Sequence, residues 1–275
     1  MNYRHAFHAG NGPDVFKHIV LTRVLRALHK EEAPFCIIDT HAGRGKYVLR
    51  KGGEHEEGIG LLWPERAQWP AFADYLSVVA KFNGKDRLKF YPGSPFIIRE
   101  FLRPQDRAVF LELHPEEHAA LAALIGPTKG VQICNMDAWQ GLKGFIPPKE
   151  ERGLVLIDPP FEKTDDFADI AATLRTATKC WHNGIYMIWY PLKAEYPIAR
   201  LHRAVAALGL PALAAELTTL PTDVPHRLNG SGIVLINPPW QLKETLAREL
   251  PPLAQRLAGP NGTPGVRVEE LRQAG

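Results

Sequence analysis

Five short apolar segments constrain the fold of this chain more than any other feature of its sequence. They span residues 35–39, 108–113, 131–137, 153–158 and 185–191. Between them lie segments with the apolar periodicity of amphipathic helices, such as 115–126 and 164–179. Strands that are apolar on both faces and alternate with helices are typical of a parallel sheet covered on both sides. We therefore predict an α/β fold around one central sheet, preceded by a helix that begins near Pro13.

The last part of the sequence breaks this alternation. Two further apolar segments, 213–221 and 231–239, are separated by PTDVPHRLNG, which is rich in turn residues and has no helical periodicity. A parallel pair of strands needs a longer crossover connection than this. We therefore expect the sheet to end in an antiparallel hairpin.

The spacing of the strands also predicts an insertion. Almost seventy residues separate the segments 35–39 and 108–113, where one helix needs about a third of that length. We expect a single domain over residues 1–275, with a small helical subdomain inserted at about 51–92 and a flexible tail at 260–275.

Three successive strands end in a carboxylate: Asp39, Glu112 and Asp137. Ligands of open α/β sheets bind at the carboxyl ends of the strands, so these residues should line one rim. Asp39 opens the glycine-containing turn DTHAGRG, which lacks the full spacing of a dinucleotide-binding loop. This arrangement favours a nucleoside that carries an amino acid, such as S-adenosylmethionine, although a tight turn without a ligand would read the same way.

Two similar proline motifs, IDPPF at 157–161 and INPPW at 236–240, pose a choice of active site. The amino group of adenine is a poor nucleophile, and two acceptors aimed at its hydrogens would localise its lone pair. The Asp158 carboxylate and the carbonyl of Pro159 could serve in this way, and Phe161 could stack on the base. In an antiparallel last strand Asn237 would emerge at the opposite rim, so we assign the site to Asp158. The alternative reading of either motif is a strand ended by prolines.

The sequence resembles a known family at this point. IDPPF matches the Asp/Asn-Pro-Pro-Tyr/Phe/Trp motif of amino-group methyltransferases. The ordered motifs YRHAFHAGNGPDVFKH, DTHAGRG, YPGSP, ELHP, IDPPF, WYP and SGIVLINPPW are similar to those of the RlmJ family of bacterial 23S ribosomal RNA adenine-N6 methyltransferases. The resemblance runs from Tyr3 to Trp240. It implies a Rossmann-like class I methyltransferase sheet with an inserted helical subdomain, S-adenosyl-L-methionine as methyl donor, and 23S ribosomal RNA as substrate.

Carried over by position, the resemblance implies roles for particular residues. Asp158 would be catalytic, and the RNA would meet Tyr3, with Arg4 and His5 beside it. The cofactor would be bound by His18, His41, Ser94, Glu112, Asp137, Ala138 and Asp158. Two positions depart from the family pattern: Phe161 stands where tyrosine is usual, and Ala138 where glycine is expected.

The remaining expectations concern partners and place. No cysteine or carboxylate joins His5, His8 and His18 at ligand spacing, so we expect no metal site. The sequence has no membrane-spanning segment, and its net charge of +3 permits an anionic partner. We expect a cytoplasmic monomer. DNA adenine-N6 or protein glutamine methylation is the alternative activity, and an RNA-binding protein that retains the fold is the non-enzymatic alternative.

Overall fold

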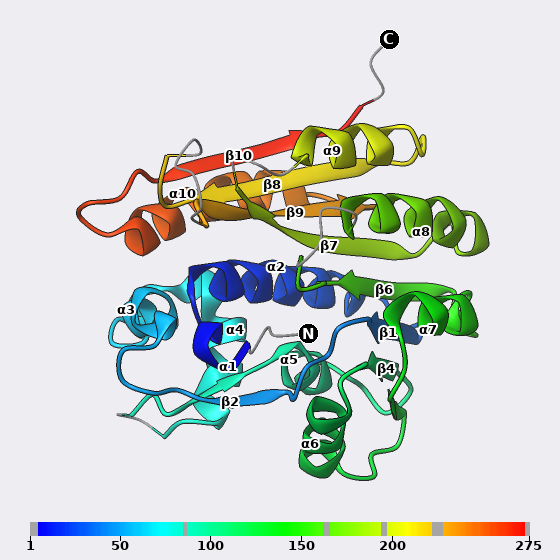
Figure 1. Ribbon diagram of the computed structural model, residues 1–275, viewed down its shortest axis with the longest axis horizontal. Helices are drawn as coiled ribbons and strands as arrows, with labels where there is room; N and C mark the ends of the chain where they lie inside the picture. The colour runs from blue at the N-terminus through cyan, green and yellow to red at the C-terminus, as the bar shows by residue number, and fades with distance from the viewer. Residues whose placement is uncertain (1–4, 85–86, 162–165, 194–196, 222–227, 273–275) are drawn as a thin grey trace.

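A large mixed sheet forms the centre of the molecule in a computed structural model that describes residues 5–84, 87–161, 166–193, 197–221 and 228–272 (Figure 1). Eight strands of the described chain lie in the order β10-β8-β9-β7-β6-β1-β4-β5. Their bounds are β1 (Phe35–Asp39), β4 (Arg107–Leu111), β5 (Val131–Cys134), β6 (Arg152–Ile157), β7 (Ile185–Leu192), β8 (Ala212–Thr218), β9 (Gly230–Ile236) and β10 (Gly265–Glu270). The five apolar segments found in the sequence are thus β1, β4, β5, β6 and β7.

Helices cover both faces of this sheet, as the apolar strands require. Alternating side chains of β1 show the arrangement, because Ile37 belongs to one buried cluster and Ile38 to the other. The Ile37 face is covered by α2 (Gly12–Leu28), α5 (Ser94–Glu100), α6 (Pro115–Ile125) and α10 (Leu242–Ala258). The Ile38 face is covered by α7 (Ala138–Phe145), α8 (Asp166–Cys180) and α9 (Ile198–Ala206).

The helix expected near Pro13 is α2, and it follows the short helix α1 (His5–His8). Asn11 caps α2 by accepting a hydrogen bond from the backbone N–H of Asp14 at 2.9 Å. Almost the whole circumference of α2 is buried, including Lys17 and His18. A helix buried on nearly every side must find partners for its polar side chains, and this requirement shapes the site described below.

The long connection between β1 and β4 is folded. It contains β2 (Lys46–Val48) and β3 (Phe90–Pro92), which pair antiparallel in a separate ribbon. The helical elements between these two strands are η1 (Glu54–Glu57), α3 (Ile59–Leu62), η2 (Arg66–Gln68), η3 (Pro70–Phe72) and α4 (Ala73–Lys81). Tyr75 and Leu76 of α4 and Ile59 and Leu62 of α3 join the same buried cluster as α2.

The end of the sheet is antiparallel, as predicted from the short connection. β9 pairs antiparallel with both β7 and β8. The expected flexible tail at 260–275 is wrong for part of its length, because Gly265–Glu270 form β10 and pair antiparallel with β8. Val266 and Val268 of this strand pack against the core, and α10 lies beside it. No helix of the described residues is long and apolar enough to cross a membrane.

Candidate active site

The parallel strands bring the predicted carboxylates to one edge of the sheet. Asp39, the last residue of β1, is in register with Phe110 of β4 and Leu156 of β6. Glu112 and Asp158 therefore leave their strands at nearly the same level as Asp39. This shared rim is the geometry that the sequence predicts for the site.

The glycine turn after β1 is built around Glu112. The carboxylate accepts the backbone N–H of Gly43 at 2.8 Å and that of His114 at 2.7 Å. Gly43 has a φ of 62°, and a Cβ at this position would lie 2.4 Å from the hydroxyl of Tyr47. Only glycine fits such a place without strain. A carboxylate has about four lone-pair positions, so Glu112 keeps capacity for further donors such as sugar hydroxyls.

Asp39 and Ser94 form a buried pair beneath this turn. The Ser94 hydroxyl donates to Asp39 Oδ2 at 2.6 Å, and the backbone N–H of His41 donates to Oδ1 at 3.2 Å. Burial raises the pKa of Asp39 to about 7, although both hydrogen bonds act in the opposite direction. Burial likewise lowers the pKa of His41 to about 4, so this imidazole is neutral at neutral pH. The His41 ring packs edge-on against Trp139.

Asp137 lies elsewhere than we expected. β5 ends at Cys134, and Asp137 is the N-cap of α7 rather than the end of the strand. Its Oδ1 accepts the backbone N–H groups of Trp139 and Gln140, each at 3.0 Å. Ala138 is the first residue of α7 and is buried. The residue types of 135–138 are typical of a turn and helix cap, which the apolar pattern of β5 obscured.

Among the predicted residues near the N-terminus, the structure describes the side chain of His18 but not those of Tyr3, Arg4 and His5. His18 is 1% exposed, stacks on Tyr91, and has its Nδ1 2.8 Å from the Tyr91 hydroxyl. Tyr3 and Arg4 lie outside the described residues. His5 is the first residue of α1, and its side chain is also outside the described part.

Sequence reasoning missed Lys17, the residue that contacts Asp158. The Lys17 ammonium is 2.5 Å from Asp158 Oδ2 and 2.9 Å from Asp14 Oδ1, and its side chain is 7% exposed. Burial alone would lower the pKa of Lys17, but the two carboxylates raise it well above its usual value. Lys17 therefore stays charged and holds one oxygen of Asp158. A signal was present, because Asp14 and Lys17 stand three residues apart within a helix of otherwise apolar pattern.

Phe161 differs from our expectation of an available stacking face. Its ring is 5% exposed and packs against Phe167 and Trp189, with ring centres 4.9 and 5.8 Å away. Its φ is 50°, in the left-handed region that side chains other than glycine, asparagine and aspartate rarely adopt. Strained residues of this kind cluster at functional sites.

The second proline motif lies at the opposite rim, as the antiparallel direction of β9 predicts. Asn237 donates from Nδ2 to the carbonyls of His182 and Gly184, at 2.8 and 2.9 Å, just before β7 begins. Its backbone N–H donates to Pro211 at the start of β8. Asn237 thus ties together the ends of three strands and has no access to Asp158.

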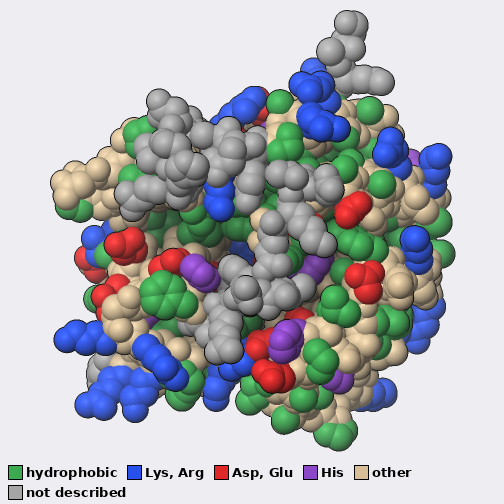
Figure 2. Space-filling model, in the orientation of Figure 1, with side chains coloured by type: hydrophobic (Ala, Val, Ile, Leu, Met, Phe, Trp, Pro, Cys, Tyr) green, Lys and Arg blue, Asp and Glu red, His purple; other side chains and the backbone are tan. Residues whose placement is uncertain are grey.

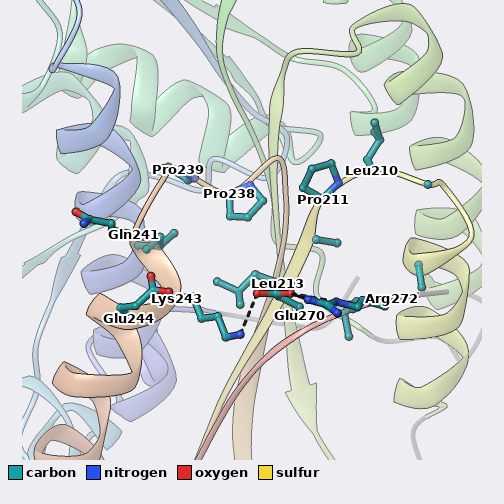
Figure 3. A pocket seen from close by; sticks show the side chains of 15 residues that line it. Leu210, Pro211, Leu213, Pro238, Pro239, Gln241, Lys243, Glu244, Glu270 and Arg272 are labelled. Carbon is teal, nitrogen blue, oxygen red and sulfur yellow. Dashed lines mark hydrogen bonds and ion pairs between the residues drawn. The ribbon is translucent and has the colours of Figure 1, made fainter. Parts of the chain in front are cut away.

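A surface pocket of about 520 Å³ opens beside this motif (Figure 3). Pro238 and Pro239 line it together with Pro211, and Lys243 pairs with Glu270 across it at 2.9 Å. Because this pocket is at the end of the sheet away from Asp158, it is separate from the rim that holds the predicted site.

Basic side chains gather at the end of the β2–β3 ribbon that is away from the glycine turn (Figure 2, lower left). The exposed ones include Arg50, Lys51, Arg87 and Lys89. β2 follows directly from the glycine turn, and β3 leads into Ser94, so the ribbon is joined to the site at both ends. Within the described residues no group of three or more histidine, cysteine or acidic side chains could hold a metal ion.

The chain is similar in sequence to ribosomal RNA methyltransferases and similar in structure to a solved protein. A family model described as "Ribosomal RNA large subunit methyltransferase D, RlmJ" matches residues 32–269. Two proteins named "Ribosomal RNA large subunit methyltransferase J" are similar over nearly their whole length. The one from Haemophilus influenzae is 40% identical and is covered to 98%, as is this chain, and the one from Escherichia coli is 37% identical with 96% of each chain covered. A solved Legionella pneumophila structure has a TM-score of 0.87 and 33% identity, over 95% of this chain and 98% of that one.

Proposed function

This chain belongs to the RlmJ family of ribosomal RNA large subunit methyltransferases, and from that premise we propose how its residues methylate adenine N6 in 23S ribosomal RNA. The observation that carries the proposal is the contact between Lys17 and Asp158. This contact fixes the Asp158 side chain, which is 19% exposed, at the end of β6 on the rim shared with Asp39 and Glu112. A carboxylate in this place can orient an amine at the edge of a cofactor site.

The cofactor is S-adenosyl-L-methionine, and the rim suits its chemistry. We propose that Glu112 accepts the ribose hydroxyls, because its two oxygens are already oriented by Gly43 and His114. Asp39 and Ser94 would lie beneath the amino-acid end, with neutral His41 above. Asp137 and Ala138 would meet the adenine end through the start of α7. When bound, the cofactor supplies a methyl group on a positively charged sulfur.

The protein's part in the reaction is to orient the target amine. We propose that the other oxygen of Asp158 and the carbonyl of Pro159 accept the two N6 hydrogens, while Lys17 remains bonded to Oδ2. Bound S-adenosyl-L-methionine would supply the methyl group, and its sulfur would keep the electrons of the broken carbon–sulfur bond. Asp158 and Pro159 would hold the amine with its lone pair toward that methyl group, and Asp158 would take the proton that the methylated nitrogen loses. Most of the acceleration would come from this positioning.

The substrate surface is proposed to extend from the rim onto the β2–β3 ribbon. Residues 51–92 would form an inserted subdomain, and its Lys51, Arg87 and Lys89 would contact phosphates together with the adjacent Arg50. Tyr3, Arg4 and His5 would approach the RNA from the N-terminal segment.

Labelled methyl transfer to three substrates tests this function. We expect the enzyme to methylate protein-free 23S ribosomal RNA, and not double-stranded DNA or bulk protein, when all three are offered side by side. Digestion of the product to nucleosides should give N6-methyladenosine. Transfer to DNA adenine or protein glutamine instead would replace this proposal with the corresponding alternative. Absence of transfer with cofactor binding retained would favour an RNA-binding protein.

A substitution at Glu112 tests the cofactor site. Glu112→Ala should weaken S-adenosylmethionine binding by about 1–3 kcal/mol, because charge-assisted hydrogen bonds to the ribose are lost. Calorimetric titration measures the change. The control is Glu117→Ala, which removes a carboxylate of α6 that pairs with Arg44. Unchanged affinity in a folded Glu112 variant would take Glu112 out of the cofactor site.

A further inference from the structure

Two buried hydrogen-bond donors of β7 and β9 have no acceptor among the residues that the structure describes. They are the indole Nε1 of Trp189 in β7 and the hydroxyl of Ser231 in β9, and neither has a partner within the described part of the chain. Ser231 is 1% exposed. Buried polar groups are nearly always paired, so two such groups in one place need an explanation.

The two donors lie on the same face of the sheet. β7 and β9 are antiparallel, with Trp189 opposite Ile233 and Pro191 opposite Ser231. Opposite residues share a face, and so do residues two apart along a strand. Ile233 belongs to the cluster beneath α2, which places both donors on the α2 side, as diagonal neighbours.

Trp189, the nearer of the two donors, lies beside Asp158 on the neighbouring strand. Ile157 of β6 pairs with Ile188 of β7, so Asp158 and Trp189 are the next residues on neighbouring strands. The Lys17 ammonium, which holds Asp158, is also 6.0 Å from the centre of the Trp189 ring. The indole therefore borders the place where the target amine must lie.

The partner that these donors fit is the target base itself. Adenine carries its amine between two ring acceptors, N1 and N7, and Asp158 accepts from the amine. Cytosine has one ring acceptor beside its amine, and guanine has a carbonyl oxygen at the corresponding position. Two donors beside one carboxylate thus match adenine and neither of these bases.

We propose that Trp189 and Ser231 donate hydrogen bonds to N1 and N7 of the target adenine and so select this base. The inference rests on the proposed function. Both donor atoms are buried, so the base reaches them by displacing what covers them, and the Phe161 ring is in contact with Trp189.

An orphaned indole alone would not support this inference. Trp63 and Trp69 also have indole N–H groups without a partner in the described chain, and they lie in the helical segment between β2 and β3. What distinguishes Trp189 is the second donor on the same face and the contact with Lys17. Trp63 therefore offers a matched control.

The adenine that the wild-type enzyme methylates is first identified in 23S ribosomal RNA. The test then uses a synthetic RNA hairpin that contains this adenine. The target nucleotide is adenosine, 1-deazaadenosine or 7-deazaadenosine, each of which keeps the amine. For the wild type we expect kcat/KM to fall by about ten- to a hundredfold with each analogue. Trp189→Phe and Ser231→Ala should each lose a similar factor on adenosine, and each should become insensitive to one of the two analogues.

A variant that has lost a contact to the base should lose the penalty of the matching analogue, whereas a variant that only disturbs the fold should keep it. Trp63→Phe should show wild-type penalties with both analogues. Thermal unfolding and S-adenosylmethionine titration check that the variants are folded, and both substitutions are conservative. If Trp189→Phe and Ser231→Ala keep the full wild-type penalties, the donors do not read the base and the inference is wrong. Absence of wild-type transfer to the unmodified hairpin and to 23S ribosomal RNA would instead overturn the proposed function.

Discussion

Asp158→Ala is expected to lower the rate of methyl transfer by about a thousandfold or more, with S-adenosylmethionine affinity changed only a few fold. Alanine has no acceptor for an N6 hydrogen of the target adenine and leaves Lys17 with one carboxylate partner. The variant should still fold, because Lys17 retains its ion pair with Asp14, in which Nζ is 2.9 Å from Oδ1. Single-turnover transfer to 23S ribosomal RNA measures the rate, and calorimetry measures cofactor binding.

Asn237→Ala is the matched control, because INPPW resembles IDPPF so closely. It removes hydrogen bonds to His182 and Gly184 and replaces a residue whose φ is 53°, so we expect a stability loss of about 1–3 kcal/mol. Turnover per folded molecule should stay within a few fold of wild type. A folded Asn237 variant that binds cofactor but transfers no methyl group would show that the site is assigned to the wrong motif.

The parallel part of the fold could be predicted because its strands are buried on both faces. Such strands are continuous apolar runs in the sequence. The antiparallel pairing of β8 and β9 could be predicted because the connection between them is too short for a parallel crossover. β10 was missed although Val266 and Val268 alternate with Arg267 and Glu269. An edge strand after GPNGTPG has only one buried face, so its pattern is short and resembles a tail.

The rim could also be predicted, because residues at strand ends are placed by topology alone. Lys17 and Phe161 could not be placed in this way. The position of Lys17 depends on how α2 packs on the sheet, which no local pattern encodes, and its carboxylate partner is 141 residues away. Phe161 is buried against Phe167 and Trp189, which no pattern within IDPPF predicts. Asp137 shows the opposite error, since its local role as a helix cap differs from the strand end that we assumed.

Lys17→Met should have the second large effect, on activity and stability together. Lys17 separates and neutralises Asp14 and Asp158, and Asp14 also accepts the backbone N–H of Gly10 at 2.9 Å. Removing one partner from a buried ionic cluster typically costs about 3–5 kcal/mol, because the remaining charges lose their compensation. We expect that loss in chemical unfolding. We also expect turnover per folded molecule to fall at least about a hundredfold, since Asp158 loses the ion pair that orients it.

Two further variants separate these effects. Arg23 lies on α2, as Lys17 does, and its ion pair with Glu249 of α10 has an N–O distance of 2.7 Å. Arg23→Met should reduce stability without reducing turnover per folded molecule. Lys17→Met combined with Asp14→Asn leaves one carboxylate in place of two, so like-charge repulsion is removed and part of the stability should return. Activity should stay low, because the remaining carboxylate, Asp158, is still without the ammonium that orients it. Recovery of turnover together with stability would mean that Lys17 acts only on the fold, and that Asp158 needs no partner to orient the amine.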